Sequence, residues 1–99
     1  MIKKKQQPTL NPQELRELRS KIHHLKPVVI IGNNGLSDAV LHEINRALDD
    51  HELIKIRTNI DDRELRDNVT NEICTKLNAI LVQTIGQIVA VYRKNLQQD

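Results

Sequence analysis

The stretch 28–58 constrains the fold more than any other part of the chain. It opens with four β-branched apolar residues, Val28–Ile31, which are typical of a strand buried on both faces. A Gly-Asn-Asn-Gly turn at 32–35 leads into a helical pattern for which Ser37 is a good N-cap. Leu53–Thr58 then alternates as a second strand does. A strand, a helix and a strand in succession predict two parallel strands joined by a crossover.

A helix is expected on each side of this unit. Asn11 and Glu14 have capping-box spacing before a first helix, and Pro27 stops that helix at Lys26. The second helix is expected to break at 49–52. Asp61 or Asp62 could cap the third. The apolar stripes of the three helices are Leu15, Leu18, Ile22 and Leu25, then Val40, Leu41, Ile44, Ala47 and Leu48, then Leu65, Val69, Ile73 and Leu77.

Two further β-rich runs complete the pattern. They are Ala79–Thr84 and Gln87–Arg93, with a tight turn predicted at 85–86. The predicted fold is therefore α/β, a two-layer or sandwich arrangement in the order α-β-α-β-α-β-β, with a mixed sheet of about four strands.

The chain length of 99 residues allows one domain. Residues 1–10 are expected to be a flexible basic arm, 11–95 the single domain and 96–99 a tail. No apolar run approaches transmembrane length and the N-terminus is too polar for a signal peptide, so a cytoplasmic protein without membrane contact is expected. One cysteine, Cys74, excludes an internal disulfide and is expected to be a small buried apolar residue. We expect a monomer.

Positive charge is concentrated near the N-terminus. The net charge is +2, but residues 1–26 hold seven Lys/Arg against two Glu, whereas the remainder holds eight against eleven acids. This asymmetry suggests a local face for an anionic partner. Lys3, Lys4 and Lys5 are better explained as a solubilising tail.

The loop Gly32-Asn33-Asn34-Gly35 is the sharpest candidate binding feature. It joins a strand to a helix N-terminus, where backbone N–H groups and the helix dipole favour an anion such as a phosphate. Glycine allows a sharp turn and a close approach, and the two asparagines can hydrogen-bond phosphate, sugar or base edges. The alternative is a plain tight turn between strand and helix.

A basic helix flank supplies context for the loop. Helical spacing places Arg16, Arg19 and His23 together on one flank of the first helix, with Lys26 at its end. The opposite flank mixes signs, with Glu14, Glu17 and Lys21. Weaker additions, each also explicable as an ordinary exposed charge, are Lys55 and Arg57 on the second strand and Arg93 and Lys94 after the last.

Catalytic and metal sites are not expected. His23 and His24 are adjacent, so on a helix they point about 100° apart and do not readily share a metal. The acidic run at 49–52 is better explained as a solvated helix end than as metal ligands. No nucleophile–base pair is evident, which argues against a small RNA-processing enzyme. Three glycines supply neither a Walker loop nor a dinucleotide fingerprint, so no cofactor is expected.

Three segments together resemble a known family. Lys26–Ser37, His51–Ile56 and Gly86–Arg93 resemble the YhbY family of stand-alone bacterial CRM domains, named for chloroplast RNA splicing and ribosome maturation. The resemblance covers roughly residues 10–93. It departs from the family at Asn33, where many CRM domains place a basic residue, and at the C-terminus, where related chains can carry a basic tail.

The resemblance implies an RNA-binding domain whose fold is similar to the C-terminal domain of bacterial translation initiation factor three. It also implies an association with precursors of the large ribosomal subunit, with residues 32–35 and neighbouring cations meeting RNA.

Tyr92 is the only aromatic residue, so modules that stack bases on aromatic platforms are excluded. The leading hypothesis is an rRNA-binding protein that assists ribosome assembly. The alternative is a protein-interaction adaptor on pre-ribosomal particles.

Overall fold

The computed structural model describes residues 10–95. The predicted arm, apart from Leu10, and the predicted tail lie outside the described residues. The elements are α1 (Pro12–Ile22), β1 (Pro27–Ile31), α2 (Asp38–His51), β2 (Leu53–Thr58), α3 (Arg63–Leu77), β3 (Ile80–Ile85) and β4 (Ile88–Tyr92). Their order confirms the predicted α-β-α-β-α-β-β arrangement.

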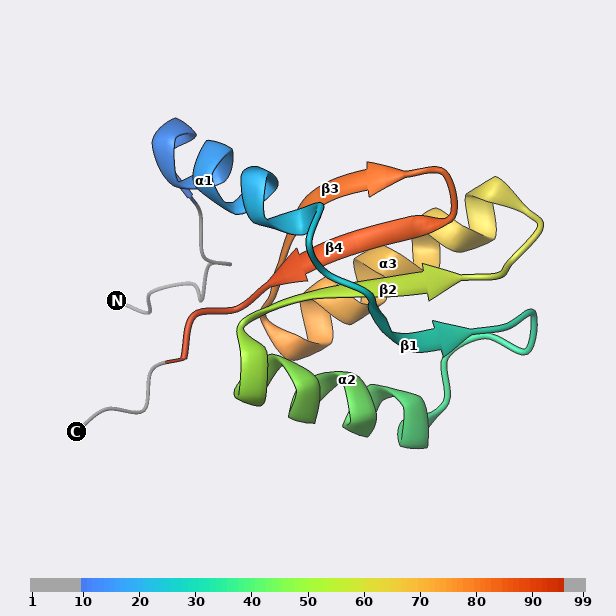
Figure 1. The fold of residues 1–99 in the computed structure, drawn as a ribbon. Helices are drawn as coiled ribbons and strands as arrows, with labels where there is room; N and C mark the ends of the chain where they lie inside the picture. Colours follow the sequence, from blue (N-terminus) through green and yellow to red (C-terminus); the bar gives the residue numbers. More distant parts are fainter. Residues whose placement is uncertain (1–9, 96–99) are drawn as a thin grey trace, which may run out of the picture.

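The strands form one mixed sheet in the order β1-β2-β4-β3. β1 and β2 are parallel and are connected through α2, so the predicted crossover is confirmed. β4 lies antiparallel to both β2 and β3. β1 is therefore an edge strand, and the loop that follows it lies at one corner of the molecule (Figure 1).

The helices cover the two faces of the sheet unequally. α2 and α3 bury the larger core against one face, where Ile44, Leu48, Ile56 and Ile73 have no exposed surface. α1 lies alone on the opposite face, which is turned toward the viewer in Figure 1 with α3 behind the sheet. Apolar burial on this scale is the main stabilising contribution to such a fold.

α1 covers only part of its face. The small cluster beneath it consists of Ile22, Leu53, Val82 and Ala90, with Leu15, Leu18, Leu25 and Tyr92 packed around them. These residues lie toward the start of β2 and the end of β4, away from the loop that follows β1. The remainder of this sheet face is left without a helix.

The prediction that Val28–Ile31 is buried on both faces is wrong. Val29 and Ile31 belong to the larger core, but Val28 is 44% exposed and Ile30 is 61% exposed. The reason is topological: β1 is at the edge of the sheet, on the side that α1 does not reach. All four residues are apolar, so the sequence shows no alternation that could reveal which of them would be exposed to solvent.

The first and second helices end elsewhere than predicted. α1 stops at Ile22 and a turn follows, in which the Leu25 N–H donates to the Ile22 carbonyl at 3.0 Å. Pro27 disfavours helical backbone at the preceding residue, which is consistent with the early end. α2 continues past the start of the predicted break at 49–52 and extends to His51. Glu52 is its C-cap and adopts φ +66°.

The third helix and the hairpin also differ in detail. Of the two candidate caps, Asp62 is the one used, and its Oδ1 accepts from the Glu64 N–H at 3.0 Å. Leu65, predicted on the apolar stripe, is 39% exposed. The β3–β4 turn is at 86–87, one residue later than predicted, because Gly86 supplies the positive φ of +58° that a two-residue hairpin turn requires.

Candidate functional site

The glycine-rich loop is a closed β-turn at the end of β1. The Gly35 N–H donates to the Gly32 carbonyl at 2.9 Å, and Gly35 has φ +82°, a conformation that favours glycine. A Cβ placed at Gly32 would meet no atom within 4 Å. The turn therefore presents open backbone, as the sequence predicted.

The two asparagines of the loop are not equivalent. Asn33 is tied to the β2–α3 connection, because its Oδ1 accepts from the Asp61 N–H at 3.2 Å. Its Nδ2 group is left as the donor for a ligand. Asn34 is exposed and forms no hydrogen bond with any residue in 10–95. Asn34 is the loop side chain with both its donor and acceptor open to a ligand.

Three aspartates surround the loop, together with the Arg66 guanidinium, which donates to the Ile60 carbonyl at 2.9 Å and to the Asp61 carbonyl at 3.4 Å. Asp61 is linked to the loop by the hydrogen bond to Asn33, Asp62 caps α3, and Asp38 begins α2. The loop also contains no cation of its own. An anion at this turn therefore draws its positive charge from neighbouring elements.

That charge is present on the neighbouring strands. Lys55 and Arg57 are the only charged residues in the four strands, and both lie on the α1 side of β2. Arg57 pairs in register with Ile30, two residues before the loop, and Lys55 pairs with Pro27, which follows Lys26. Among residues 10–95, neither Lys55 nor Arg57 has a carboxylate within ion-pair distance. These two strand cations are therefore not neutralised by described residues.

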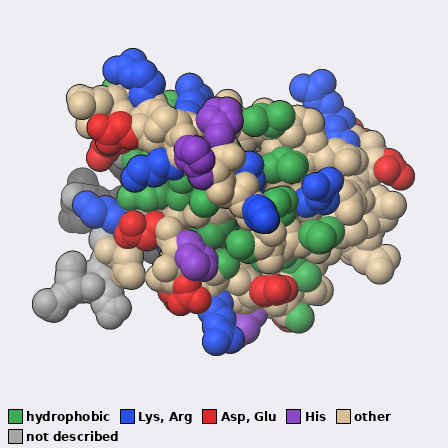
Figure 2. All heavy atoms as spheres, in the orientation of Figure 1, with side chains coloured by type: hydrophobic (Ala, Val, Ile, Leu, Met, Phe, Trp, Pro, Cys, Tyr) green, Lys and Arg blue, Asp and Glu red, His purple; other side chains and the backbone are tan. Residues whose placement is uncertain are grey.

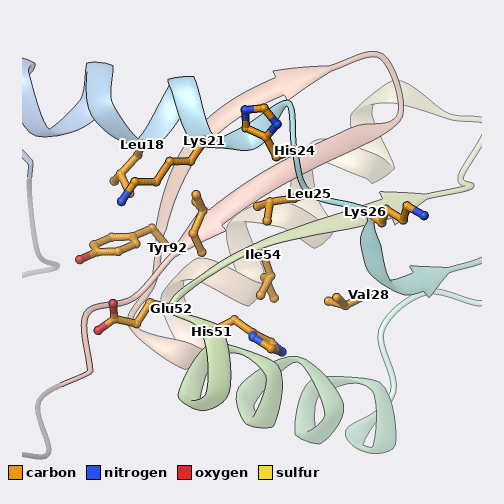
Figure 3. Close-up of a pocket in the computed structure, with 11 residues that line it drawn as sticks. Leu18, Lys21, His24, Leu25, Lys26, Val28, His51, Glu52, Ile54 and Tyr92 are labelled. Carbon is orange, nitrogen blue, oxygen red and sulfur yellow. The ribbon is translucent and has the colours of Figure 1, made fainter.

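The predicted basic flank of α1 is only partly formed. Arg16, Arg19 and His23 are exposed on α1 and at its C-cap, and the Arg19 Nε donates to the Val82 carbonyl of β3 at 3.4 Å. The expectation that Lys26 closes this flank is wrong, because the helix ends four residues earlier. Lys26 instead lies beside β1, next to Val28 (Figure 3). The predicted site residues thus form two groups, one along β1 and β2 and one on α1.

A groove of about 510 Å³ lies between α1, the start of β1 and the end of α2 (Figure 3). Its apolar lining includes Leu25, Val28 and Ile54. Its polar lining consists of Lys21, His24, Lys26, His51, Glu52 and Tyr92. Its two lysines outnumber the single carboxylate, so the groove extends the cationic character of this face.

The Tyr92 phenol lines this groove, and its pKa is raised above the usual 10.0 by burial and by the carboxylates of Glu52 and Glu14. It therefore remains a neutral hydrogen-bonding group across the physiological range. Burial likewise raises the pKa of the Cys74 thiol, which packs in the larger core as predicted. Such a thiol is a poor nucleophile.

Arg93 holds elements together instead of presenting charge. Its guanidinium donates to Asn45 Oδ1 at 2.8 Å, to the Asn45 carbonyl at 3.0 Å, to the Leu77 carbonyl at 3.0 Å and to Asp49 Oδ1 at 2.7 Å. These bonds join the residue after β4 to α2 and to the end of α3. The weaker expectation that Arg93 belongs to the basic surface is therefore wrong.

The part of the α1-side sheet face that α1 leaves uncovered, here called the open half of the sheet, also presents apolar side chains that the sequence analysis did not identify. Hydrophobic side chains gather over this face with Lys or Arg side chains between them (Figure 2). The exposed apolar side chains that the strands place on it are Val28, Ile30 and Ile85, with Ile88 half-buried. Only the strand order could have revealed them, because Val28, Ile30 and Ile88 belong to apolar runs and Ile85 falls in the predicted turn.

Two further observations concern what residues 10–95 contain. None of their helices is both long and apolar enough to cross a membrane. Nor do these residues bring three His, Cys, Asp or Glu side chains together as a metal site would require.

Comparison with known proteins identifies the family. Residues 10–93 match the CRS1/YhbY (CRM) domain family. The chain is 44% identical over 86 residues to the Pseudomonas aeruginosa protein named "Probable RNA-binding protein PA4753", covering 87% of this chain and 83% of the relative. It is 45% identical over 85 residues to a Haemophilus influenzae protein named "RNA-binding protein", covering 86% of each.

A solved structure shows the same fold. The solution structure of protein SAV1595 from Staphylococcus aureus superposes with a TM-score of 0.77 at 25% identity, covering 92% of this chain and 95% of that one. The matched family is one of binding domains, in agreement with the prediction that the chain is not an enzyme. The family match and the two relatives, each covering most of the chain, lead to one conclusion: the chain belongs to the CRS1/YhbY (CRM) domain family.

Proposed function

We propose that this protein binds RNA through the α1 side of its sheet and the adjoining glycine-rich loop. The proposed contacts are Gly32, Asn33, Asn34 and Gly35 in the loop, Lys26, Lys55 and Arg57 along β1 and β2, and Arg16, Arg19 and His23 on and beside α1. One relative is named an RNA-binding protein and the other a probable RNA-binding protein, which supports this choice of ligand.

One observation carries the proposal. The four strands contain two charged residues, both are cations, and both lie on the face that α1 leaves partly open. Charges within strands cost stability when a sheet face is covered, so two unpaired cations on an open face suit an anionic partner. A phosphate backbone is such a partner, and backbone contacts carry little sequence information.

We further propose that the RNA is rRNA in precursors of the large ribosomal subunit, that the protein assists their assembly in the cytoplasm, and that it acts as a monomer. The residues resembling stand-alone CRM domains support this choice. In this proposal residues 11–95 are the binding domain.

The test is fluorescence anisotropy with large-subunit and small-subunit rRNA fragments across a salt series. The variant Lys55→Gln/Arg57→Gln removes the two strand cations. If each neutralises one phosphate, the log–log salt slope should fall by about 1.4 to 1.8. The matched control, Arg46→Gln/Lys76→Gln, removes two cations from exposed positions on α2 and α3 on the opposite side of the sheet.

Three outcomes would contradict the proposal: an RNA complex insensitive to salt, an equal loss in both double variants, or no binding. Preference for large-subunit fragments, and co-sedimentation with large-subunit precursors over mature subunits, would support the ribosomal part. Equal binding to both fragment sets and to mature subunits would refute that part and leave RNA binding intact.

The adaptor alternative is favoured by one observation, the exposed apolar side chains on the same face. An adaptor would bind a ribosomal or assembly protein there. In that case Lys55→Gln/Arg57→Gln would leave recruitment to particles unchanged, whereas changes to the exposed apolar residues would abolish it.

A further inference from the structure

We infer that the open half of the sheet is a base-contacting platform for unpaired RNA, made of aliphatic side chains around one arginine. The platform, here called the Ile–Arg row, consists of Ile30, Arg57, Ile88 and Ile85. The inference rests on the proposed RNA binding and adds to it which part of the RNA, its bases, meets this surface.

The row is defined by strand register. Ile30 on β1 is paired with Arg57 on β2, Arg57 with Ile88 on β4, and Ile88 with Ile85 on β3. The four side chains therefore stand side by side across the whole sheet, on the α1 side. With strands about 4.8 Å apart the row is about 14 Å long. RNA-recognition modules stack two or three bases on the aromatic side chains of a four-stranded sheet. This sheet also has four strands, but the row offers aliphatic side chains and one guanidinium instead.

The row is open to solvent. Ile30 is 61% exposed and Ile85 is 53% exposed, and Val28 extends the apolar surface at 44%. α1 does not cover it, because the cluster beneath α1 lies at the other end of the strands. Figure 2 shows this side of the molecule, with hydrophobic side chains at its centre. Exposed apolar groups arranged contiguously mark an interaction surface.

The charge of this surface selects the partner. The strands contribute no carboxylate to it, while Arg57 lies within the row and Lys55 lies beside it. A partner must therefore offer flat or apolar groups together with negative charge. Unpaired RNA does so, because each base presents an apolar face and each linkage a phosphate, and a guanidinium can stack on a base.

Continuity with the loop favours RNA over an acidic peptide. Ile30 is two residues from Gly32, where the turn has open space around its backbone. An RNA strand can place a phosphate at the turn and successive bases along the row. A duplex cannot use the row, because its bases are stacked and paired.

The experiment compares Ile30→Thr/Ile85→Thr with the wild type. Threonine keeps the β-branched shape that suits strands while removing apolar surface and no charge. The control is Leu81→Thr, which changes an exposed leucine of β3 on the opposite face, at 41%. Urea unfolding would establish that each variant is folded.

The probes are a labelled single-stranded RNA dodecamer of mixed sequence, the same strand annealed to its complement, and an abasic strand of equal length. The isoleucine variant should lose about five-fold or more in affinity for the single strand, with an unchanged salt slope. Its affinity for the duplex and for the abasic strand should match that of the wild type, as should all three affinities of Leu81→Thr.

Other results would overturn the inference. Unchanged single-strand affinity would mean that bases do not touch the row. An equal loss on duplex and abasic probes would assign the effect to the phosphate backbone. Loss of binding to assembly proteins with RNA affinity intact would make the row a protein-docking surface. If the wild type binds none of the three probes, the proposed function itself fails, which is a distinguishable result.

Discussion

Replacing Arg93 with methionine should lower the free energy of unfolding by about 2–4 kcal/mol. The guanidinium makes four hydrogen bonds to α2 and the end of α3, and its side chain is 18% exposed. A hydrogen bond to a charged group contributes about 1.5–3 kcal/mol net, and a surface ion pair about 0–1. The bond to Asp49 belongs to the second class, because that carboxylate is 65% exposed.

The remaining three bonds account for the loss. They are not additive, since one group makes all of them and water can reach part of the site once the guanidinium is gone. Methionine retains the apolar stem, so the change isolates the hydrogen bonds from side-chain packing. The free energy of unfolding of Arg93→Lys should lie between those of the wild type and Arg93→Met, because an ammonium cannot donate to four acceptors as a planar guanidinium does.

Urea unfolding followed by circular dichroism measures the effect, with Lys94→Met as the control. Lys94 is exposed and adjacent, so its loss should cost no more than about 0.5 kcal/mol. A cost for Arg93→Met below about 1 kcal/mol, or equal to that of Lys94→Met, would refute the structural role argued for Arg93. In folded samples, Arg93→Met should leave the salt slope of RNA binding unchanged.

Three other predictions concern the core, the loop and the groove. Ile44→Ala, at a fully buried position, should destabilise by about 2–5 kcal/mol in urea unfolding, while Leu65→Ala should stay within about 0.5. Gly35→Ala should cost about 1–2 kcal/mol because of its φ of +82°, whereas Gly32→Ala should be neutral or slightly stabilising; equal effects would contradict the turn geometry. The pKa of the Tyr92 phenol should lie above 10.0 in the folded protein and near 10 in denaturant. The absorbance of the phenolate measures both values. Because the folded-state pKa is raised, the stability linked to this proton is present below pH 10 and is lost as pH rises through the raised value.

The element order could be predicted because local signals agreed with the final fold. The capping box at Asn11, the cap at Ser37 and the apolar spacing of α2 each specify a helix without tertiary information. The crossover between β1 and β2 followed from chain order alone. Strand order in the rest of the sheet carries no such local signal, so the exposure of Ile30 could not be predicted.

The sequence predicts the turn at 32–35 and the face of β2 that carries Lys55 and Arg57, but not how the candidate site is arranged. The loop and the strand cations Lys55 and Arg57 were identified by residue type and alternation. The grouping of Lys26 with the α1 flank failed because helical spacing was extended past Ile22, where the backbone already turns. Arg93 was misassigned because an arginine that bonds carbonyls has the same sequence signature as one that faces solvent.

The placement of cations on the sheet, with none in the loop, has a consequence for RNA affinity. If Arg16, Arg19, Lys26, Lys55 and Arg57 each neutralise one phosphate, the salt slope for single-stranded RNA is about −3.5, and affinity falls about 100-fold between 50 and 200 mM salt. The contribution of the Ile–Arg row's isoleucines does not decay with salt in this way. It multiplies single-strand affinity by a constant factor, so Ile30→Thr/Ile85→Thr should lower the ratio of single-strand to duplex affinity by the same factor at every salt concentration and leave both salt slopes unchanged. A variant whose single-strand salt slope differs from that of the wild type would mean that the isoleucines act through the phosphate contacts and not through the bases.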